Sequence, residues 1–321
     1  MDQPQFDTGS GSFAARLGLS VIQTRSLQWY RTQIRDALEL FVLPGLAAVL
    51  PWRLCFAVFR QLAKYPGLYH EATEAGWVWA HKTMPTLEAQ KWQRERRLLT
   101  LVDHADWVLA KTRSMRWVDK HVDIEGNWPK ADGTQVLLTF HWGAGMWALH
   151  DMHRAGLSVH ALAASLDGAH FKGRTVLHAY AKLRTAEVFR AMGHPTIDVT
   201  ASMRPVLQAI RQQECLLGLV DVPADNFGAG VPVQMFGLEA LVPKGLLRLA
   251  ADKELPVTVY LTGLDFQTGR RKWVIHTLGV VPDAQKLQDE VFALFNQAVK
   301  DKPGCWHLWS EMPRFTPKSQ G

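Results

Sequence analysis

Cysteine is scarce in this chain of 321 residues, which contains only Cys55, Cys215 and Cys305. The three lie far apart and have no paired spacing, so the sequence predicts neither a disulfide framework nor a zinc site. Reduced thiols in a cytosolic setting are the simplest interpretation. The sequence also has no Walker loop, no Gly-x-Gly-x-x-Gly opening a helix, no Gly-x-Ser-x-Gly elbow and no His-Glu-x-x-His pair. We therefore expect no bound metal and no cofactor.

Long uninterrupted apolar runs are missing as well. The first 35 residues are polar, so we expect no secretory signal, and we expect residues 1–15 to be disordered. The segment Leu38–Leu62 is strongly apolar, but charged residues and prolines interrupt it. A spanning helix needs about 20 mostly apolar residues. We expect a membrane-embedded or interfacial hairpin broken near Pro51, and the alternative is a buried helix pair packed on the main domain.

Positive charge is in excess, with a formal net charge of +6 and a pI near 9.3. Such a balance favours an anionic partner, either lipid headgroups, phosphorylated cofactors or nucleic acid. Of the 13 tryptophans, most lie in the N-terminal half, interleaved with arginine and lysine. Because Trp favours the membrane interface and basic residues favour anionic lipid, an anionic membrane surface is one interpretation. The other is a Trp-rich helical core with a solvated basic face. No nucleic-acid-binding module is recognisable, so we expect no nucleic acid partner.

The periodicity of the sequence changes near residue 122. Residues 25–122 have helical spacing, most clearly at Glu88–Leu109, whereas strand-like and helix-like segments alternate afterwards. Alternation of this kind predicts an α/β fold with a mostly parallel central sheet flanked by helices. We expect a helical, membrane-associating region at 16–121 and an α/β domain at 122–321, together forming one compact unit. The predicted strands are Val122–Glu125, Gln135–Phe140, Ser158–Ala163, Leu216–Val220, Val257–Leu261 and Lys272–Thr277. The predicted helices are Trp147–Arg154, Val176–Met192, Ser202–Gln213, Lys244–Asp252 and Asp283–Lys300.

The segment Val136–Trp147 is the strongest functional signal. A buried strand ends at His141, small residues follow, and a helix begins after them. The carboxyl ends of strands are where α/β sheets place their chemistry, and imidazole moves a proton near neutral pH. We expect His141 to be the catalytic base. Trp142 and Gly143, directly after it, are expected to lie against a substrate.

Other segments supply candidate partners for His141. A second strand ends at Asp221 and runs into a turn-rich loop, in which Asp221 and Asp225 are candidates to orient a histidine and ordinary turn chemistry is the alternative. The candidate substrate-binding residues outside the histidine block are Arg184, Asn226, Gly228, Phe236, Gly237 and Lys244. Lys244 opens a helix whose first amides suit a phosphate or carbonyl oxygen, although it also fits a plain helix start.

Five blocks in this order resemble one family, the lipid A biosynthesis (lauroyl/myristoyl) acyltransferases of the lysophospholipid acyltransferase superfamily. The resemblance covers roughly residues 38–315. The blocks are Leu50–Leu54, Thr139–Gly143, Asp221–Gly237, Pro243–Ala250 with Pro256 and Val257, and Trp306–Trp309.

The resemblance implies transfer of a fatty acyl chain from an acyl carrier protein or coenzyme A thioester to a hydroxyl of a lipid or glycolipid acceptor. His141 would be the general base, and no covalent intermediate would form. It also implies a place at the cytoplasmic face of the bacterial inner membrane, either peripheral or with a short embedded segment.

One position departs from the family pattern. The family places an acidic residue five positions after the histidine, and this chain has Met146 there. A thioether cannot accept a charge-assisted hydrogen bond from an imidazole. Either Asp221 or Asp225 replaces that acid, or His141 is a weaker base, or the protein is a non-catalytic relative that binds acyl chains or acyl carriers. A soluble thioester-handling enzyme is a third and weaker hypothesis.

Overall fold

The computed structural model describes residues 26–163, 171–226 and 230–316, and the predicted disorder at 1–15 lies outside them. A seven-stranded sheet runs through the described chain in the order β1-β9-β8-β2-β5-β3-β4. Its strands are β1 (Val122–Glu125), β2 (Val136–Thr139), β3 (Val159–Ala163), β4 (Ile197–Asp198), β5 (Cys215–Leu219), β8 (Val257–Leu264) and β9 (Arg271–Gly279). Every neighbouring pair is parallel except β8 and β9, which form an antiparallel hairpin. The predicted α/β class with a mostly parallel sheet is therefore confirmed.

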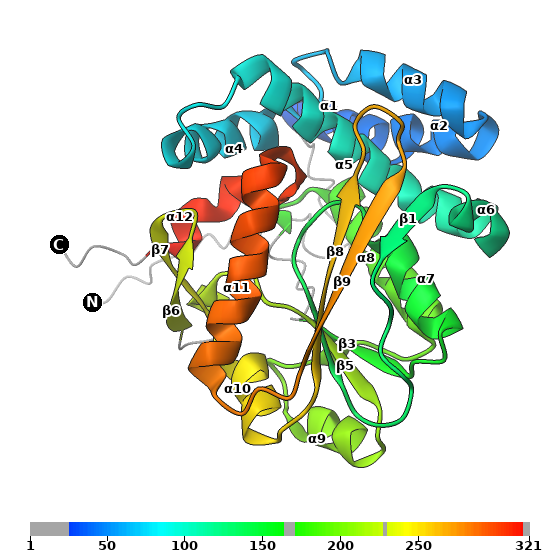
Figure 1. The fold of residues 1–321 in the computed structure, drawn as a ribbon. Coiled ribbons are helices and arrows are strands. Elements are labelled where there is room, and N and C mark those ends of the chain that lie inside the picture. The colour runs from blue at the N-terminus through cyan, green and yellow to red at the C-terminus, as the bar shows by residue number, and fades with distance from the viewer. Residues whose placement is uncertain (1–25, 164–170, 227–229, 317–321) are drawn as a thin grey trace, which may run out of the picture.

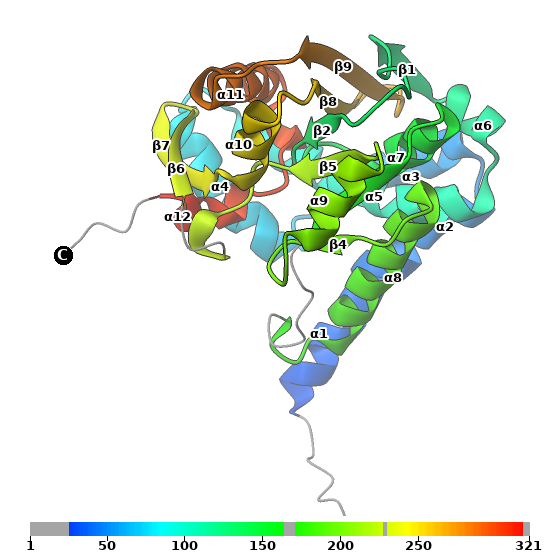
Figure 2. The ribbon, with the colours of Figure 1, turned by 90° about the horizontal axis from the view of Figure 1, so that it is seen from below.

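Helices cover both faces of this sheet. Figure 2 shows α10 (Gly245–Asp252) and α11 (Ala284–Asp301) on one side, with α7 (Met146–Arg154) and α8 (Thr175–Met192) on the other. Helix α9 (Arg204–Arg211) packs on β5. Strand β2 is buried along its whole length because it lies at the centre of the sheet under both layers. Its run of Val, Leu and Leu suits a strand that meets no solvent on either face.

The N-terminal helices form a further layer across the top of the sheet in Figure 1. It comprises α1 (Leu27–Ala37), the π-helical turn η2 (Leu38–Val42), α2 (Leu43–Val49), α3 (Trp52–Leu62), α4 (His70–Thr83), α5 (Ala89–Thr112) and α6 (Met115–Asp119). One hydrophobic core runs through both layers, from Ala47 to Phe315. The helical segment is interrupted at Leu50 and Pro51, between α2 and α3, which is where the sequence predicted a break. In the part of the chain that the structure describes, no helix is long and apolar enough to cross a membrane.

The predicted helices and strands after residue 122 are all present, with ends shifted by at most three residues. Two features were not predicted. One is the short strand β4, whose two residues carry no periodic signal. The other is the separate antiparallel hairpin of β6 (Gly230–Met235) and β7 (Leu238–Pro243), whose turn residues were interpreted as ligand contacts. Short 3₁₀ turns η4 (Ala224–Asn226), η5 (Pro303–Cys305) and η6 (Trp309–Glu311) and the helix α12 (Met312–Phe315) complete the described chain.

Candidate active site

His141 and Asp221 come together at the carboxyl edge of the sheet. β2 and β5 are parallel neighbours, with Thr139 opposite Leu219, so the residues that follow the two strands meet at one edge. Nδ1 of His141 lies 3.0 Å from Oδ1 of Asp221. The His141 side chain is 34% exposed, whereas that of Asp221 is completely buried. The pair therefore has one buried anionic end and one end open to solvent.

Asp221 is held in place by further hydrogen bonds. The backbone N–H of His141 donates to both carboxylate oxygens, at 3.0 and 2.8 Å, and the indole Nε1 of Trp306 donates to Oδ2 at 2.7 Å. A carboxylate accepts only, so the imidazole proton on this side belongs to Nδ1 and the lone pair lies on Nε2. No described residue hydrogen-bonds Nε2 of His141. This is the arrangement in which an acid fixes the tautomer of a histidine that acts as a base.

The turn after His141 depends on Gly143. Its φ of +66° is a conformation that side chains rarely adopt, and a Cβ there would lie 1.4 Å from the carbonyl oxygen of Thr262. The amide of Gly143 donates to the Cys305 carbonyl and the next amide donates to the Thr262 carbonyl, both at 2.9 Å. The backbone therefore approaches β8 too closely for any other residue. The small residue makes room for the backbone of β8, and contact of Gly143 with a substrate stays a prediction.

A buried polar cluster holds this turn through a hydrogen bond to the Gly143 carbonyl. Nε2 of His307 donates to the carbonyl of Gly143 at 2.6 Å, and Nδ1 of His307 accepts from the Arg96 guanidinium at 3.1–3.2 Å. Burial and the charge of Arg96 lower the pKa of His307 to about 3, so this imidazole is neutral at ordinary pH. Burial alone would raise the pKa of Asp103, but the charge of Arg184 lowers it to about 2.

Arg184 belongs to the same cluster. Its guanidinium donates to Asp103 at 2.7 Å and to the hydroxyl of Tyr180 at 3.1 Å. Its guanidinium is therefore already engaged with groups inside the protein. The geometry gives it a supporting position, and contact with a substrate stays a prediction.

Aromatic rings pack beside the His141–Asp221 pair. Trp306 forms a β-bridge with Trp142, and its ring lies 5.2 Å from Phe236 and 5.0 Å from Trp309 between centroids. Phe236 and Gly237 have φ values of 56° and 81° and form the two-residue turn between β6 and β7. Trp142 is buried, and Phe236 packs against the aromatic group. These positions are structural in the described chain, and a role in ligand binding for them is not shown.

Among the described residues, none of the remaining candidates hydrogen-bonds His141. Asp225 forms an ion pair with Arg314 at 2.8 Å, with both side chains partly exposed, so the structure assigns it a surface partner in place of the histidine. Lys244 is exposed at the start of α10, and its side chain makes no ion pair with a described residue. Asn226 closes the turn η4, and Gly228 lies outside the described residues. Met146 is buried as the first residue of α7.

Sequence reasoning missed the supporting residues of the site. Trp306 was noted in an aromatic terminal block, but nothing in the sequence showed that its indole would bond Asp221. Arg96 lies on a long amphipathic helix and resembles any other charged residue there. A polar residue at a position with apolar neighbours on a helix face would have been the available signal.

Comparison with known proteins adds no family assignment: no protein-family model matches the chain, and no curated protein sequence matches it significantly. The fold and the site define its class on their own. The chain is an α/β protein with a histidine–aspartate pair suited to acid–base chemistry at the carboxyl edge of a parallel sheet.

Proposed function

We propose that the protein is an acyltransferase that moves a fatty acyl chain from a thioester to a hydroxyl of a lipid or glycolipid acceptor. The observation that carries the proposal is the pair of His141 and buried Asp221, with Nε2 of the imidazole left open at the carboxyl edge of the sheet. The ordered sequence blocks that resemble lipid A acyltransferases supply the reaction class.

In this proposal His141 acts as a general base. The acceptor hydroxyl donates its hydrogen bond to Nε2, which takes the proton as the oxygen attacks the thioester carbonyl. The tetrahedral intermediate then expels the thiolate, and the imidazolium returns the proton to the sulfur. Asp221 stabilises the positive imidazolium while it exists. The amides of Trp142, Gly143 and Ala144 already donate within the protein, so the oxyanion needs a different donor.

Asp221 also bears on the hypothesis of a non-catalytic relative. That hypothesis rested on Met146, which stands where the family has an acid. A carboxylate from the segment after β5 lies at hydrogen-bonding distance of His141, so the missing acid is not an argument against catalysis. The binding-protein hypothesis is kept as an outcome of the activity test below.

The N-terminal helices support a place at a membrane surface. An apolar stripe runs along α1, η2 and α2 with side chains 44–75% exposed at Leu27, Ile34, Leu38, Val42 and Val49. Their spacing of mostly four or seven residues places them on one face of the helix. An exposed apolar face on a basic protein suits a helix lying in the interface of an anionic membrane. We propose peripheral binding to the cytoplasmic face of the bacterial inner membrane.

A basic cleft of about 740 Å³ is a candidate place for the thioester donor. Its cationic lining residues are Arg60, Lys64, Lys91, Arg94 and Arg97, which outnumber the two acidic ones, Glu88 and Glu95. Phe266 and Gln267, which also line it, follow the carboxyl end of β8, a strand that runs parallel to β2 and extends beyond it. Acyl carrier proteins are acidic and coenzyme A carries phosphates, so this charge suits either donor.

The activity test uses purified protein, anionic liposomes containing total lipid extract, and labelled acyl carrier protein or acyl coenzyme A. Wild type is compared with His141→Ala and with His276→Ala, a half-buried histidine on β9 as control. We expect an acylated lipid with wild type and the control, and a loss of at least about 1,000-fold with His141→Ala. Equal activity of His141→Ala and wild type would contradict the proposal. No wild-type product, with acyl chain or carrier still bound, would support the binding protein instead.

Separate variants test membrane binding and the choice of acyl donor. Ile34→Glu with Leu38→Glu should abolish flotation with anionic liposomes, whereas Leu207→Glu on α9 should not. Arg94→Glu should raise the KM for an acyl carrier donor about tenfold, which corresponds to about 1.4 kcal/mol. Lys253→Glu, at the end of α10, is the matched surface control.

A further inference from the structure

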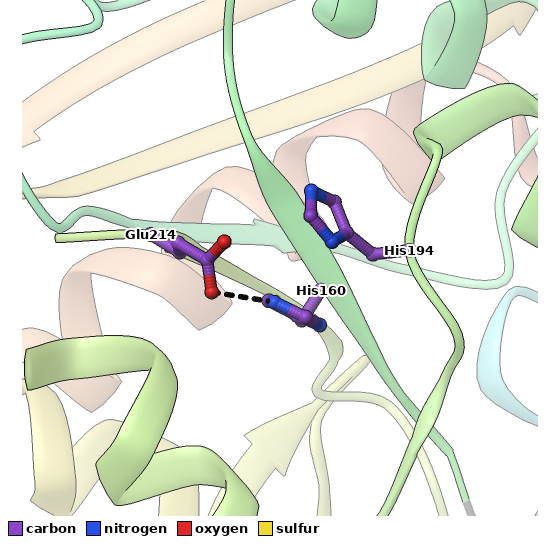
Figure 3. Close-up of side chains that lie close together, drawn as sticks. All are labelled: His160, His194 and Glu214. Atoms are coloured by element: carbon purple, nitrogen blue, oxygen red, sulfur yellow. Dashed lines mark hydrogen bonds and ion pairs between the residues drawn. The ribbon is translucent and has the colours of Figure 1, made fainter. Parts of the chain in front are cut away.

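A second cluster of polar side chains lies at the opposite edge of the sheet. His160 is in β3, Glu214 immediately precedes β5, and His194 lies between α8 and β4. β3 and β5 are parallel, with Val159 opposite Cys215, which brings the three side chains together. Figure 3 shows them converging from separate segments of the chain.

The cluster is already close to the geometry of a metal site. Ligand-type atoms of the three residues all lie within 4.8 Å of one another. Nε2 of His160 and Oε2 of Glu214 are 2.8 Å apart, and the two imidazole rings lie 4.4 Å apart between centroids. A tetrahedral zinc ion with bonds of about 2.0–2.1 Å needs ligand atoms roughly 3.4 Å from each other. Small side-chain rotations are therefore sufficient to bring the donors into place.

Ser158 completes the surroundings. Its hydroxyl donates to Oε1 of Glu214 at 3.2 Å and lies 2.9 Å from Nε2 of His194. Nδ1 of His160 is buried and has no hydrogen-bond partner among the described residues. A buried ring nitrogen without a partner costs free energy that hydrogen bonds within the cluster do not recover. Nδ1 lies on the far side of the ring from Nε2, which bonds Glu214, so the spacing and the donor set are what point to a ligand.

We propose that His160, His194 and Glu214 bind a divalent transition-metal ion of the zinc type. Two imidazoles and one carboxylate are a donor set that suits zinc, whereas magnesium and calcium prefer oxygen ligands. The partly exposed site leaves the fourth position to water or to the hydroxyl of Ser158. The cysteine pattern could not predict this site because it contains no cysteine and draws its ligands from segments far apart in sequence.

The place of the site in the fold defines its role. His141 follows the carboxyl end of β2, whereas Glu214 precedes β5, so the length of the strands separates them, roughly 17 Å for five residues. The ion therefore does not touch the reacting atoms. It links β3, β5 and the segment before β4, and it stabilises this side of the sheet. The inference does not depend on the acyltransferase proposal.

The test uses the full chain without an affinity tag, treated with chelator and exchanged into chelator-free buffer. Zinc is titrated calorimetrically, with magnesium as the comparison ion, and thermal unfolding is recorded with and without zinc. We expect one zinc ion per chain, no magnesium binding, and a Tm that rises by a few degrees with zinc. Cobalt in place of zinc should give the visible absorption bands of tetrahedral coordination.

Matched variants decide whether these residues hold the ion. His160→Gln and His194→Gln should each weaken zinc binding at least about 100-fold and abolish the zinc-dependent Tm shift. His70→Gln, an exposed histidine at the start of α4, should bind as wild type does. If His160→Gln does not fold, His194→Gln gives the same answer from a loop position. Absence of stoichiometric zinc binding, or unchanged binding in a folded His194→Gln variant, would overturn the proposal.

Discussion

Replacing Asp221 by asparagine tests the candidate active site most directly. The change keeps the shape of the side chain and removes its charge. Asp221 accepts from three N–H groups: the backbone and Nδ1 of His141, and the indole of Trp306. An asparagine has one acceptor oxygen, and its NH₂ group must face one of these donors. The relief of that conflict is to move the His141 proton from Nδ1 to Nε2, which removes the basic lone pair from the open side of the ring.

The expected loss of activity follows from this tautomer change. The corresponding substitution in a serine-protease triad lowers kcat by about 10⁴. For His141 we expect a loss in kcat of roughly 10³–10⁴, which at 1.36 kcal/mol per factor of ten raises the barrier by about 4–5.5 kcal/mol. If the proton stayed on Nδ1 instead, one buried donor would be left without an acceptor, which costs about 1–3 kcal/mol of stability. Activity should therefore fall much more than folding stability.

Two assays check this reasoning. The first is acyl-transfer kinetics at saturating donor, with Asp225→Asn as the control, because its exposed pair with Arg314 is worth only about 0–1 kcal/mol. The second is ¹⁵N NMR of the His141 ring, which needs no substrate and reports which nitrogen carries the proton. A folded Asp221→Asn protein that keeps more than a tenth of wild-type kcat, or keeps its proton on Nδ1, would refute the role assigned to Asp221.

Two further predictions concern stability. Gly143→Ala should lower the free energy of unfolding by about 1–2 kcal/mol because of its positive φ. The clash with Thr262 should lower it by roughly a further 1–3 kcal/mol. Gly279→Ala, at φ +72° with open space around it, should lose only the roughly 1–2 kcal/mol that comes from φ, as measured by urea titration. Burial lowers the pKa of His104 to about 4. Because the unfolded chain takes up this proton near pH 6.5, stability is full above that pH and is lost as the pH falls toward 4, by about 2 kcal/mol between pH 7.5 and 5. His104→Gln should flatten that part of the pH profile, and an unchanged profile would contradict the assignment.

The periodicity of the sequence was sufficient to predict most of the fold. The alternation after residue 122 identified the strands and helices that build the sheet, because a strand buried on both faces and an amphipathic helix have different apolar spacing. The β6–β7 hairpin was missed because Phe236 and Gly237 suggested a ligand loop. In the structure their positive φ values are what a two-residue turn requires. The antiparallel pairing of β8 and β9 was not predicted either, although the turn between them has a local signature in Asp265, whose side chain accepts from two backbone amides, and in Gly269 at positive φ.

Local sequence determined the position of His141 at the end of a strand, the tight turn at Gly143 and the apolar character of Leu38–Leu62. These features depend on neighbours within a few residues, so they can be inferred without long-range contacts. The acid that pairs with His141 could not be inferred from neighbouring residues in this way. Asp221 is 80 positions away, and whether it or Asp225 would face His141 depended on which strands lie side by side in the sheet. Only the tertiary structure decided that, because parallel pairing of β2 and β5 buries one carboxylate beside the imidazole and leaves the other at the surface with Arg314.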